Sequence, residues 1–328
     1  MKVVSYKKLE QRVPEFLQQF FEPEAAENCA EVMLYAERRG IDGQGLLKLI
    51  GTTPLQNIKP VMPIEVQHQS VLSARLLGNR QPSFYIAQKA TQVAIEKVTS
   101  SGVGIVGANG IFSSVGALGF YAEKIARHDA IAIVMARAPG TIAAFGAKTP
   151  LFGTNPLAVA FPTEDGPFVV DMATSAITWY ELVMAKMRGQ KIPDGVAIDK
   201  NGDVTTDPVA AMDGAILPFD KSYKGSALAM IVEMMAGPLS GSTWCDFETF
   251  DKDWGLFILA FNPNLLVDLA EFKHNASDLL RIVRAQEMAD GSRKVRLPGD
   301  RSREHERRIL ETDMLELDDE VAILLGLE

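Results

Sequence analysis

The stretch SFYIAQKATQVAIEKVTSSGVGIVGANG, residues 83–110, decides the fold class because it joins a helix-like segment to a strand-like one. A helical pattern ends near Gly102, and the short apolar run of residues 103–106 is typical of a buried strand. The same order follows at once, since ALGFYAEKIARHD (117–129) predicts a helix and AIAIVMA (130–136) another strand. Helices that alternate with strands predict an α/β layer.

The flanking sequence extends this pattern. Apolar residues recur at three- and four-residue steps in EPEAAENCAEVMLYAERRGI (22–41), so the N-terminal fifth is predicted to be mostly helical. Downstream, NPLAVAFPT (155–163) and PFVVDMA (167–173) are strand-like runs that the turn EDG joins into a hairpin. SYKGSALAMIVEMMAGPLSG (222–241) predicts a long buried helix, and GLFILAFNP (255–263) predicts a strand. The C-terminal part is charge-rich and helical in pattern.

Composition excludes several classes of function. The 328 residues include 33 Lys plus Arg and 42 Asp plus Glu, and the net charge of −9 would repel a nucleic-acid backbone. The two cysteines, Cys29 and Cys245, indicate neither a disulfide framework nor a metal site. Because the N-terminus lacks a signal-peptide core and no apolar run is long enough to span a bilayer, we expect no membrane partner and a cytoplasmic location.

The motif search disfavours a conventional Rossmann domain, because no GxGxxG follows the first strands. Four loop sequences remain: FGAKTPLFGTNPLAVAFP (145–162), VVDMATSA (169–176), KSYKGSALAM (221–230) and VRLPGDRS (295–302). Each joins small or turn-forming residues to an apolar run, as loops do when they present donors to an anionic ligand such as a pyrophosphate. Alternatively, residues 153–156 are only a turn, and Thr174 and Ser175 only a helix cap.

Together these loops resemble the malate/L-lactate dehydrogenase family, which is distinct from the Rossmann lactate dehydrogenases. The most specific pieces are GTNP (153–156), DMATS (171–175), TTDPVAAMDGAILPF (205–219), YKG (223–225) and LPG (297–299). They occur in the family's order, and the resemblance covers nearly the whole chain. Members of the family include ureidoglycolate dehydrogenase, diketogulonate reductase, sulfolactate dehydrogenase and the reductases of cyclic imino acids.

The resemblance implies an α/β fold of a non-Rossmann kind, with a large mixed β-sheet, flanking helices and a helical domain built from both termini. The implied domains are residues 1–72 with 276–328, which are helical, and residues 73–275, which form the nucleotide-binding core. The resemblance also implies a homodimer and NADPH or NADH as cofactor. The residues implied to contact the cofactor are Val170, Asp171, Met172, Ala173, Thr174, Ser175, Ala176, Tyr223, Lys224, Gly299, Asp300 and Arg301. Lys224 can neutralise a diphosphate as a point charge.

This sequence departs from the family's pattern at the substrate site. Relatives commonly read D-S-H-G-V-x-R where this chain reads DGQGLLK (42–48). In that pattern the histidine donates a proton to the substrate and the arginine holds the substrate carboxylate. Here Gln44 and Lys48 take those two places, and an amide cannot protonate anything.

Two further departures lie downstream. Relatives often read S-N-H-F-G-A-x-G-Y-Y-A, and alignment on Gly116 places Ser113 and Ser114 where the asparagine and a second histidine would be. Tyr180 stands where a glycine is frequent. Gln44, Lys48, Ser114 and Tyr180 are therefore the residues expected to act on the substrate side.

Three hypotheses account for a site without these histidines. A cyclic 2-imino acid that binds already protonated, as an iminium ion, needs no acid from the protein, and we favour this hypothesis. Alternatively, a 2-oxo or 2-hydroxy acid enzyme has a relocated proton donor, for which Tyr121, Tyr180 and Lys48 are candidates. The third is a non-catalytic homologue that binds a nucleotide, although the retained cofactor loops argue against it.

Overall fold

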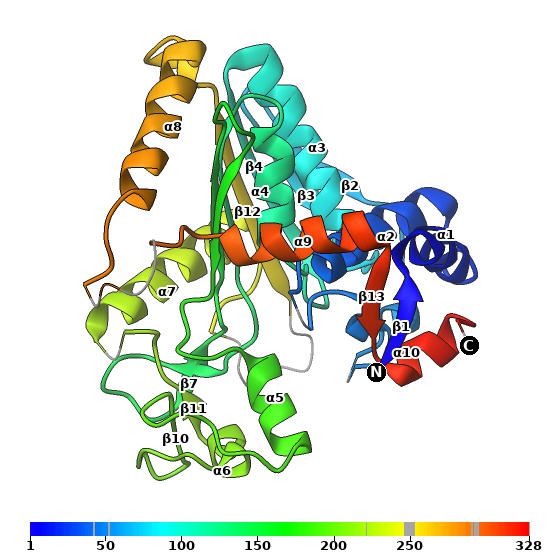
Figure 1. The fold of residues 1–328 in the computed structure, drawn as a ribbon, viewed down its shortest axis with the longest axis vertical. Helices are drawn as coiled ribbons and strands as arrows, with labels where there is room; N and C mark the ends of the chain where they lie inside the picture. The colour runs from blue at the N-terminus through cyan, green and yellow to red at the C-terminus, as the bar shows by residue number, and fades with distance from the viewer. Residues whose placement is uncertain are drawn as a thin grey trace.

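The computed structural model of the protein describes residues 1–41, 43–51, 53–220, 222–245, 253–289, 291 and 295–327. At its centre is a mixed seven-stranded sheet with the strand order β2-β3-β4-β12-β5-β8-β9 (Figure 1). The strands are β2 Glu65–Gln69, β3 Ser73–Leu77, β4 Val103–Ile111, β12 Trp254–Phe261, β5 Ile131–Ala136, β8 Leu157–Phe161 and β9 Phe168–Met172. β3 and β4 are parallel and the other neighbours antiparallel, so the predicted fold class is confirmed.

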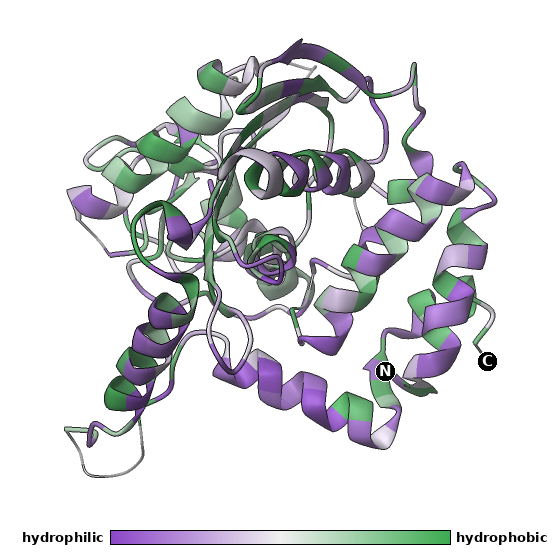
Figure 2. Ribbon diagram, turned by 90° about the horizontal axis from the view of Figure 1, so that it is seen from above, coloured by the Kyte–Doolittle hydropathy of each residue, from purple (hydrophilic) through white to green (hydrophobic). Residues whose placement is uncertain are grey.

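Two helices cover one face of this sheet. α3 (Ser83–Ser101) packs on β4, and α4 (Leu118–Ala126) packs on β5 and β8. The predicted helix end is confirmed, because Gly102 caps α3 in the left-handed conformation at φ 77°. Hydrophobic ribbon segments gather around the sheet, while the surrounding helices alternate hydrophobic and hydrophilic residues (Figure 2).

The predicted hairpin is also confirmed. β8 and β9 are antiparallel neighbours in which Ala158 pairs with Asp171 and Val159 with Val170. β12, the strand predicted at residues 255–263, lies between β4 and β5 and pairs antiparallel with both. A segment that is distant in sequence therefore completes the middle of the sheet.

The opposite face of the sheet is only partly covered. α7 (Tyr223–Ala236) packs there through Val232 and Ala236. The predicted burial of this helix is wrong for its outer side, because Met230, Ile231 and Met234 are exposed. Because α7 carries apolar residues on its outer side as well as on its packed side, its sequence matches the pattern of a fully buried helix. η3 (Pro238–Ser240) follows α7, and η4 (Pro263–Leu265) leads into α8 (Leu269–Arg284).

Segments from both ends of the chain lie side by side (Figure 1). β1 (Lys2–Ser5) pairs antiparallel with β13 (Met314–Leu317). The helical elements around them are α1 Tyr6–Leu17, α2 Pro23–Arg38, η1 Leu46–Leu49, η2 Leu55–Asn57, α9 Asp300–Thr312 and α10 Asp319–Leu324. One continuous core joins these elements to the sheet. The predicted domain limits remain a prediction; β2 belongs to the sheet, and α8 crosses residue 276.

A smaller four-stranded sheet has the order β10-β11-β6-β7. Its elements and their helices are β6 Ile142–Ala143, β7 Pro150–Phe152, β10 Ala197–Ile198, β11 Ala215–Ile216, α5 Trp179–Met187 and α6 Pro208–Asp213. These elements share a separate small core. Within the described ranges, none of the helices combines the length and apolar composition that crossing a bilayer requires.

Candidate active site

The loop that carries Gln44 is shaped by two glycines. Gly43 has φ 78°, and a Cβ built on it would lie 2.5 Å from the Cγ of Tyr180. A Cβ on Gly45 would lie 2.3 Å from Oε1 of Glu37. The same Glu37 oxygen accepts a hydrogen bond from the Leu46 amide at 2.6 Å. Positions 43 and 45 therefore have to be glycine for this loop to fit between α2 and α5. Asp42, which begins the motif, lies outside the described residues.

The structure brings Gln44 and Ser114 together. The Ser114 hydroxyl donates to Oε1 of Gln44 at 3.3 Å, and its oxygen accepts from the Gly116 amide at 3.2 Å. No described residue bonds to Nε2 of Gln44, so that amide group keeps its donors for a ligand. The neighbouring Ser113 is turned elsewhere, since its hydroxyl donates to Ser83 at 2.7 Å. Two residues that cannot supply a proton at neutral pH thus lie within hydrogen-bond distance of each other.

Tyr180 lies against the same loop because its ring faces Gly43. It is the second residue of α5, whose start is fixed by a capping box between Thr178 and Glu181. Tyr121, the other tyrosine considered as a donor, is fully buried and its hydroxyl donates to the Val115 carbonyl at 2.6 Å. The position of Tyr180 is compatible with contact to a ligand, whereas that of Tyr121 is structural.

Lys48 lies in η1, four residues after Gln44, and is half-buried. Burial lowers the pKa of its ammonium group from 10.5 to about 8. Among the described residues none forms an ion pair or side-chain hydrogen bond with it. A partly desolvated ammonium group without a counter-charge is suited to bind an anion, and a carboxylate is the simplest match.

The segment predicted to contact the cofactor begins in β9, where side chains alternate between the two faces of the sheet. Asp171 faces α4, and its Oδ2 accepts from the Gly119 amide at 2.7 Å. Part of Asp171 stays open to solvent, but its carboxyl lies among protein atoms, and this desolvation raises its pKa to about 6. Val170 and Met172 point to the opposite face, so one ligand cannot reach all three side chains from one side.

After the strand, the segment turns towards the smaller sheet. Thr174 is fully buried, and both its amide and its hydroxyl bond to the Thr154 carbonyl. Ser175 is 6% exposed, and its Oγ has no hydrogen-bond partner among the described residues. A buried hydroxyl without a partner is costly unless a ligand or water satisfies it. Ala173 and Ala176 are half-buried beside it.

The remaining predicted cofactor residues lie at the starts of two helices. Tyr223 and Lys224 are exposed in the first turn of α7, which Ser222 caps. Gly299 precedes α9, and a Cβ built on it would be 3.5 Å from the carbonyl oxygen of Val169 in β9. The LPG turn is thereby brought beside the DMATS strand, although the two are far apart in sequence.

Within that turn, Asp300 and Arg301 differ in their surroundings. Asp300 bonds to Arg284 at 2.6 Å and accepts from the Leu297 amide at 2.9 Å. Its pKa is lowered, since Arg284 and this amide outweigh the effect of partial burial. Arg301 is exposed in the first turn of α9. The carboxylate therefore holds the turn, and the guanidinium is available to a ligand.

The GTNP loop has a structural role that favours the simpler interpretation of residues 153–156. Asn155 is fully buried, and its Nδ2 donates to Oε2 of Glu233 at 2.8 Å. Glu233 also pairs with the fully buried Arg137, whose Nε lies 3.1 Å from Oε1. A Cβ on Gly153 would lie 2.3 Å from the Ala138 carbonyl oxygen. The loop thus fixes α7 to the sheet instead of presenting donors.

Glu37 is the residue of the site that the sequence analysis missed. It acts from α2 on the backbone of residues 45 and 46, and an acid in a helix carries no signal of such a contact. None of the four histidines bonds to Gln44 or Ser114 among the described residues, although the His305 ring would lie 3.2 Å from a Cβ built on Gly40. His68, His128 and His274 are exposed, and Nδ1 of the half-buried His305 lies 3.0 Å from the Arg38 carbonyl oxygen.

Comparison with known proteins shows the family of the chain. The family model described as malate/L-lactate dehydrogenase matches residues 4–324. The chain belongs to this family. As a member it is an oxidoreductase, and the predicted resemblance is confirmed.

Several relatives show how wide the family is. The chain is 33% identical over 304 residues to the malate/(S)-sulfolactate dehydrogenase of Methanothermus fervidus, covering 90% of this chain and 87% of the relative. It is 30% identical over 305 residues to the Δ1-pyrroline-2-carboxylate/Δ1-piperideine-2-carboxylate reductase of Pseudomonas putida, covering 88% and 84%. The solved structure of sulfolactate dehydrogenase from Methanocaldococcus jannaschii superposes with a TM-score of 0.85 at 29% identity, covering 99% of this chain and 95% of the other.

Proposed function

We propose that the protein reduces a small cyclic 2-imino carboxylic acid with NADPH or NADH, with the substrate bound as an iminium ion. The observation that carries the proposal is the pairing of Gln44 with Ser114, 3.3 Å apart, where the family's proton donors would be. Neither side chain can release a proton near neutral pH. A relative of the same family is named as a reductase of Δ1-pyrroline-2-carboxylate and Δ1-piperideine-2-carboxylate.

The chemistry balances without a protein acid. The nicotinamide supplies a hydride when it is bound, and the hydride adds to the carbon of the C=N⁺ bond. The electron pair of that bond moves to nitrogen, which gives a neutral amine. The protein's residues then need only bind and orient the substrate. Lys48 would hold the carboxylate, and the Gln44 and Ser114 oxygens can face the cationic nitrogen.

The described residues fit a nicotinamide nucleotide. The buried hydroxyl of Ser175 has no hydrogen-bond partner among the described residues and can donate or accept. Lys224 is an exposed cation at the start of α7. Helix starts favour anions because their first amides are unpaired. Ser175 would hydrogen-bond the nucleotide and Lys224 would neutralise its diphosphate.

A histidine at position 44 tests the iminium hypothesis. Gln44→His should raise the reduction of 2-oxo acids, by about 10²-fold or more if the new imidazole donates a proton, and should leave cyclic imine reduction within a few-fold of the original. Steady-state assays of both substrate classes with both nucleotides make the comparison. Higher wild-type activity on 2-oxo acids than on cyclic imines would reject the hypothesis.

The alternative is a 2-oxo or 2-hydroxy acid enzyme in which Tyr180 donates the proton. It is favoured by the contact between Tyr180 and Gly43, which places a titratable hydroxyl beside the Gln44 loop. In that case Tyr180→Phe lowers kcat on 2-oxo acids by about 10²–10⁴-fold. Under our proposal the same variant keeps kcat for cyclic imines within a few-fold. Tyr121→Phe, which removes a buried structural hydroxyl, is the control for loss of stability.

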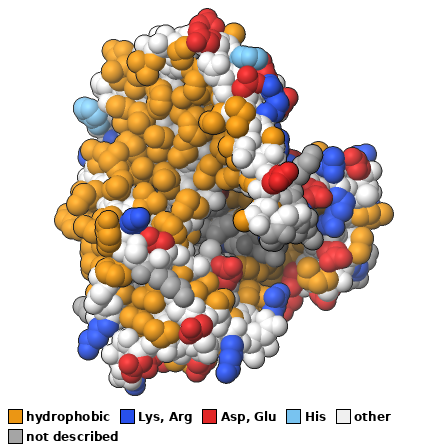
Figure 3. Space-filling model, turned by 60° about the vertical axis from the view of Figure 1, so that its left-hand side comes forward, with side chains coloured by type: hydrophobic (Ala, Val, Ile, Leu, Met, Phe, Trp, Pro, Cys, Tyr) orange, Lys and Arg blue, Asp and Glu red, His pale blue; other side chains and the backbone are white. Residues whose placement is uncertain are grey.

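We also propose that the protein is a homodimer. Figure 3 shows a broad apolar surface on the side of the molecule that carries α7 and α8. Only Ser277 of α8 is buried, while Leu279 and Ile282 are each 61% exposed. Next to this helix, an apolar cavity of about 350 Å³ opens between α8 and the β8–β9 hairpin. A helix that packs so little on its own chain gains stability from a partner, and a second copy is the proposed one.

Charge on this surface should separate the subunits. Leu279→Glu combined with Ile282→Glu places two carboxylates in the apolar contact, and burying unpaired charges is costly. We expect the mass by light scattering to fall to that of one chain, 35.8 kDa. Ile323→Glu, which changes an exposed residue of α10, should keep the mass of the wild type. A wild-type protein of monomer mass would contradict the proposal.

A further inference from the structure

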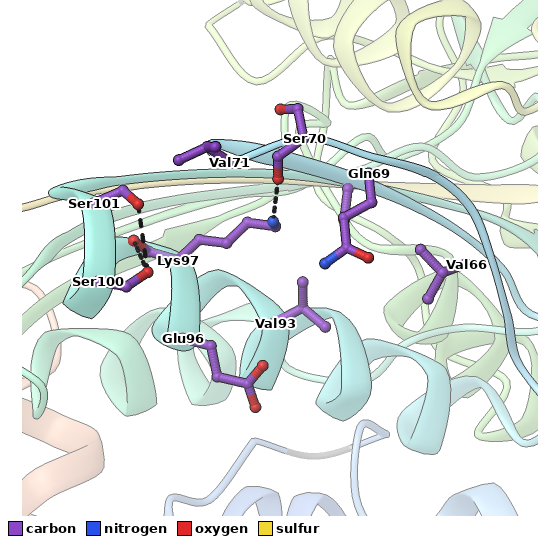
Figure 4. Close-up of a pocket in the computed structure, with 10 residues that line it drawn as sticks. Val66, Gln69, Ser70, Val71, Val93, Glu96, Lys97, Ser100 and Ser101 are labelled. Carbon is purple, nitrogen blue, oxygen red and sulfur yellow. Dashed lines mark hydrogen bonds between the residues drawn. The ribbon is translucent and has the colours of Figure 1, made fainter.

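A second cavity, which is lined by polar and apolar residues, lies apart from the residues discussed so far. It has a volume of about 360 Å³ and opens between α3 and the hairpin of β2 and β3 (Figure 4). Its lining residues are Val66, Gln69, Ser70, Val71, Ala74, Val93, Glu96, Lys97, Ser100 and Ser101. None of them belongs to the Gln44 loop, to the DMATS segment or to the starts of α7 and α9. We call it the Lys97 cavity.

Lys97 is the unusual member of this set. It is only 7% exposed, and its Nζ donates to the Ser70 carbonyl at 2.7 Å. In Figure 4 the side chain extends along the cavity towards Ser70. No described acid forms an ion pair with it. An ammonium group has three donors, so two are left over, and a buried charge is stable only when it is paired.

The other polar groups lie at different places along the cavity. In Figure 4 the side chain of Gln69 points into the cavity, whereas Ser100 lies beside the backbone of Lys97, to whose carbonyl its hydroxyl donates. The hydroxyls of Ser100 and Ser101 lie 3.4 Å apart at the end of α3. Ser70 Oγ is already used, because it bonds to Ser73 Oγ at 2.7 Å within the hairpin turn. Glu96 is exposed on the wall of the cavity and accepts from Gln92 at 3.0 Å. The cavity therefore holds one buried positive charge, with a negative charge at its rim.

The remaining wall is apolar. Val66 and Val71 from the hairpin, and the half-buried Val93 from α3, contribute methyl groups. Val66 is 51% and Val71 is 75% exposed, so water contacts these side chains when nothing covers them. A ligand that gains from this cavity carries one negative charge and a short apolar body.

We propose that the Lys97 cavity is a second ligand site, which binds a small monocarboxylate with a branched aliphatic tail. The carboxylate accepts from the Lys97 ammonium group, and the tail packs on Val66 and Val93. A divalent anion such as phosphate fits less well, because Glu96 would repel its second charge and the valines would stay in contact with water. The site lies outside the proposed substrate site and does not depend on the reaction assigned there.

The test is a titration of the full-length protein with 3-methylbutanoate, followed by ligand-observed NMR and by calorimetry. We expect binding with a Kd of about 1 mM, as is typical of a small ligand held by one charge and a few methyl contacts. Lys97→Met should weaken it at least tenfold. Lys89→Met, which removes a half-buried lysine of the same helix that does not line the cavity, should not change it. Lys48→Met should leave the Lys97-dependent binding unchanged, because Lys48 lies in η1 and does not line the Lys97 cavity.

One further variant and one competitor complete the test. Val93→Phe fills the cavity with Lys97 intact and should also abolish binding, which covers the case in which Lys97→Met fails to fold. Absence of binding up to about 10 mM in the wild type would overturn the proposal and leave Lys97 as a brace for the hairpin turn. Binding lost only in Lys48→Met would assign the probe to the substrate site. Equal competition by inorganic phosphate would reduce the cavity to an unselective anion site and so overturn the assignment of a monocarboxylate.

Discussion

Glu233→Ala should lower the free energy of unfolding by about 3–5 kcal/mol, because it leaves the buried charge of Arg137 without its carboxylate. Arg137 is fully buried, and its Nε lies 3.1 Å from Oε1 of Glu233. The variant also removes the acceptor of the Asn155 amide at 2.8 Å and of the Cys245 amide at 3.0 Å. Arg137 keeps its bonds to the Thr243 hydroxyl and to the carbonyls of Ala138 and Asp253.

Urea unfolding measures this loss, and an exposed ion pair supplies the matched control. Glu24 pairs with Lys89 at the surface. Such a pair contributes only about 0–1 kcal/mol to the free energy of unfolding, because water screens the charges and pairing costs side-chain entropy. Glu24→Ala should therefore cost at most about 1 kcal/mol. If Glu233→Ala costs no more than Glu24→Ala, the network of Arg137, Asn155 and Glu233 does not hold α7 to the sheet. Glu233→Gln, which keeps an acceptor and loses the charge, should fall between the two.

This network shows what sequence patterns can and cannot predict. The elements that form it were predicted from local periodicity, since β5, β8 and α7 each carry their own apolar signal. The contact between Arg137 and Glu233 joins positions 96 residues apart, and neither position has a local signal of burial. Charged residues are mostly exposed in proteins, so residue type alone does not indicate that Arg137 and Glu233 are buried. The place of β12 between β4 and β5 also lacked a local signal, because it depends on pairing between segments that are far apart in sequence.

At the candidate site the sequence proposed residues without indicating their orientation. Alignment proposed Gln44 and Ser114, and the structure places their side chains 3.3 Å apart although 70 positions separate them. The sequence treated residues 170–176 as one contact segment. Alternation along β9 divides them, because Asp171 faces α4 while Val170 and Met172 face the other side. That division follows from the period of a strand and was available from the pattern alone.

Lys48→Met should raise KM for the carboxylate substrate by about 10–100-fold with a smaller change in kcat, because a charge-assisted hydrogen bond contributes about 1.5–3 kcal/mol. Lys48 has no described partner, so substrate binding would supply its first counter-charge. Lys48→Arg keeps the charge and should retain more of the affinity than Lys48→Met. Lys186→Met removes an exposed lysine of α5 and should leave KM unchanged. An unchanged KM in Lys48→Met would remove Lys48 from the carboxylate role.

The same residue predicts a pH dependence with a defined sign. The pKa of Lys48 in the folded protein is about 8, so its charge is present below that pH and is lost above it. Wild-type kcat/KM should therefore fall as pH rises through about 8. This fall should be absent in Lys48→Arg, whose guanidinium stays charged. A wild-type profile that is flat from pH 7 to about 9 would contradict carboxylate binding by a charged Lys48.

Stability supplies a second readout that does not depend on substrate. Burial lowers the pKa of Lys48 from 10.5 to about 8, so the unfolded chain binds more protons than the folded one between these two values. The free energy of unfolding consequently rises with pH across that window. Below pH 8 the buried Lys48 is charged, and its destabilising effect on the fold is fully present. Lys48→Met should raise the melting temperature at pH 7, and the gain should shrink as the pH approaches 10. A variant that weakens substrate binding while it stabilises the fold would identify Lys48 as a charge kept for the ligand, since a purely structural lysine would lose stability on the same substitution.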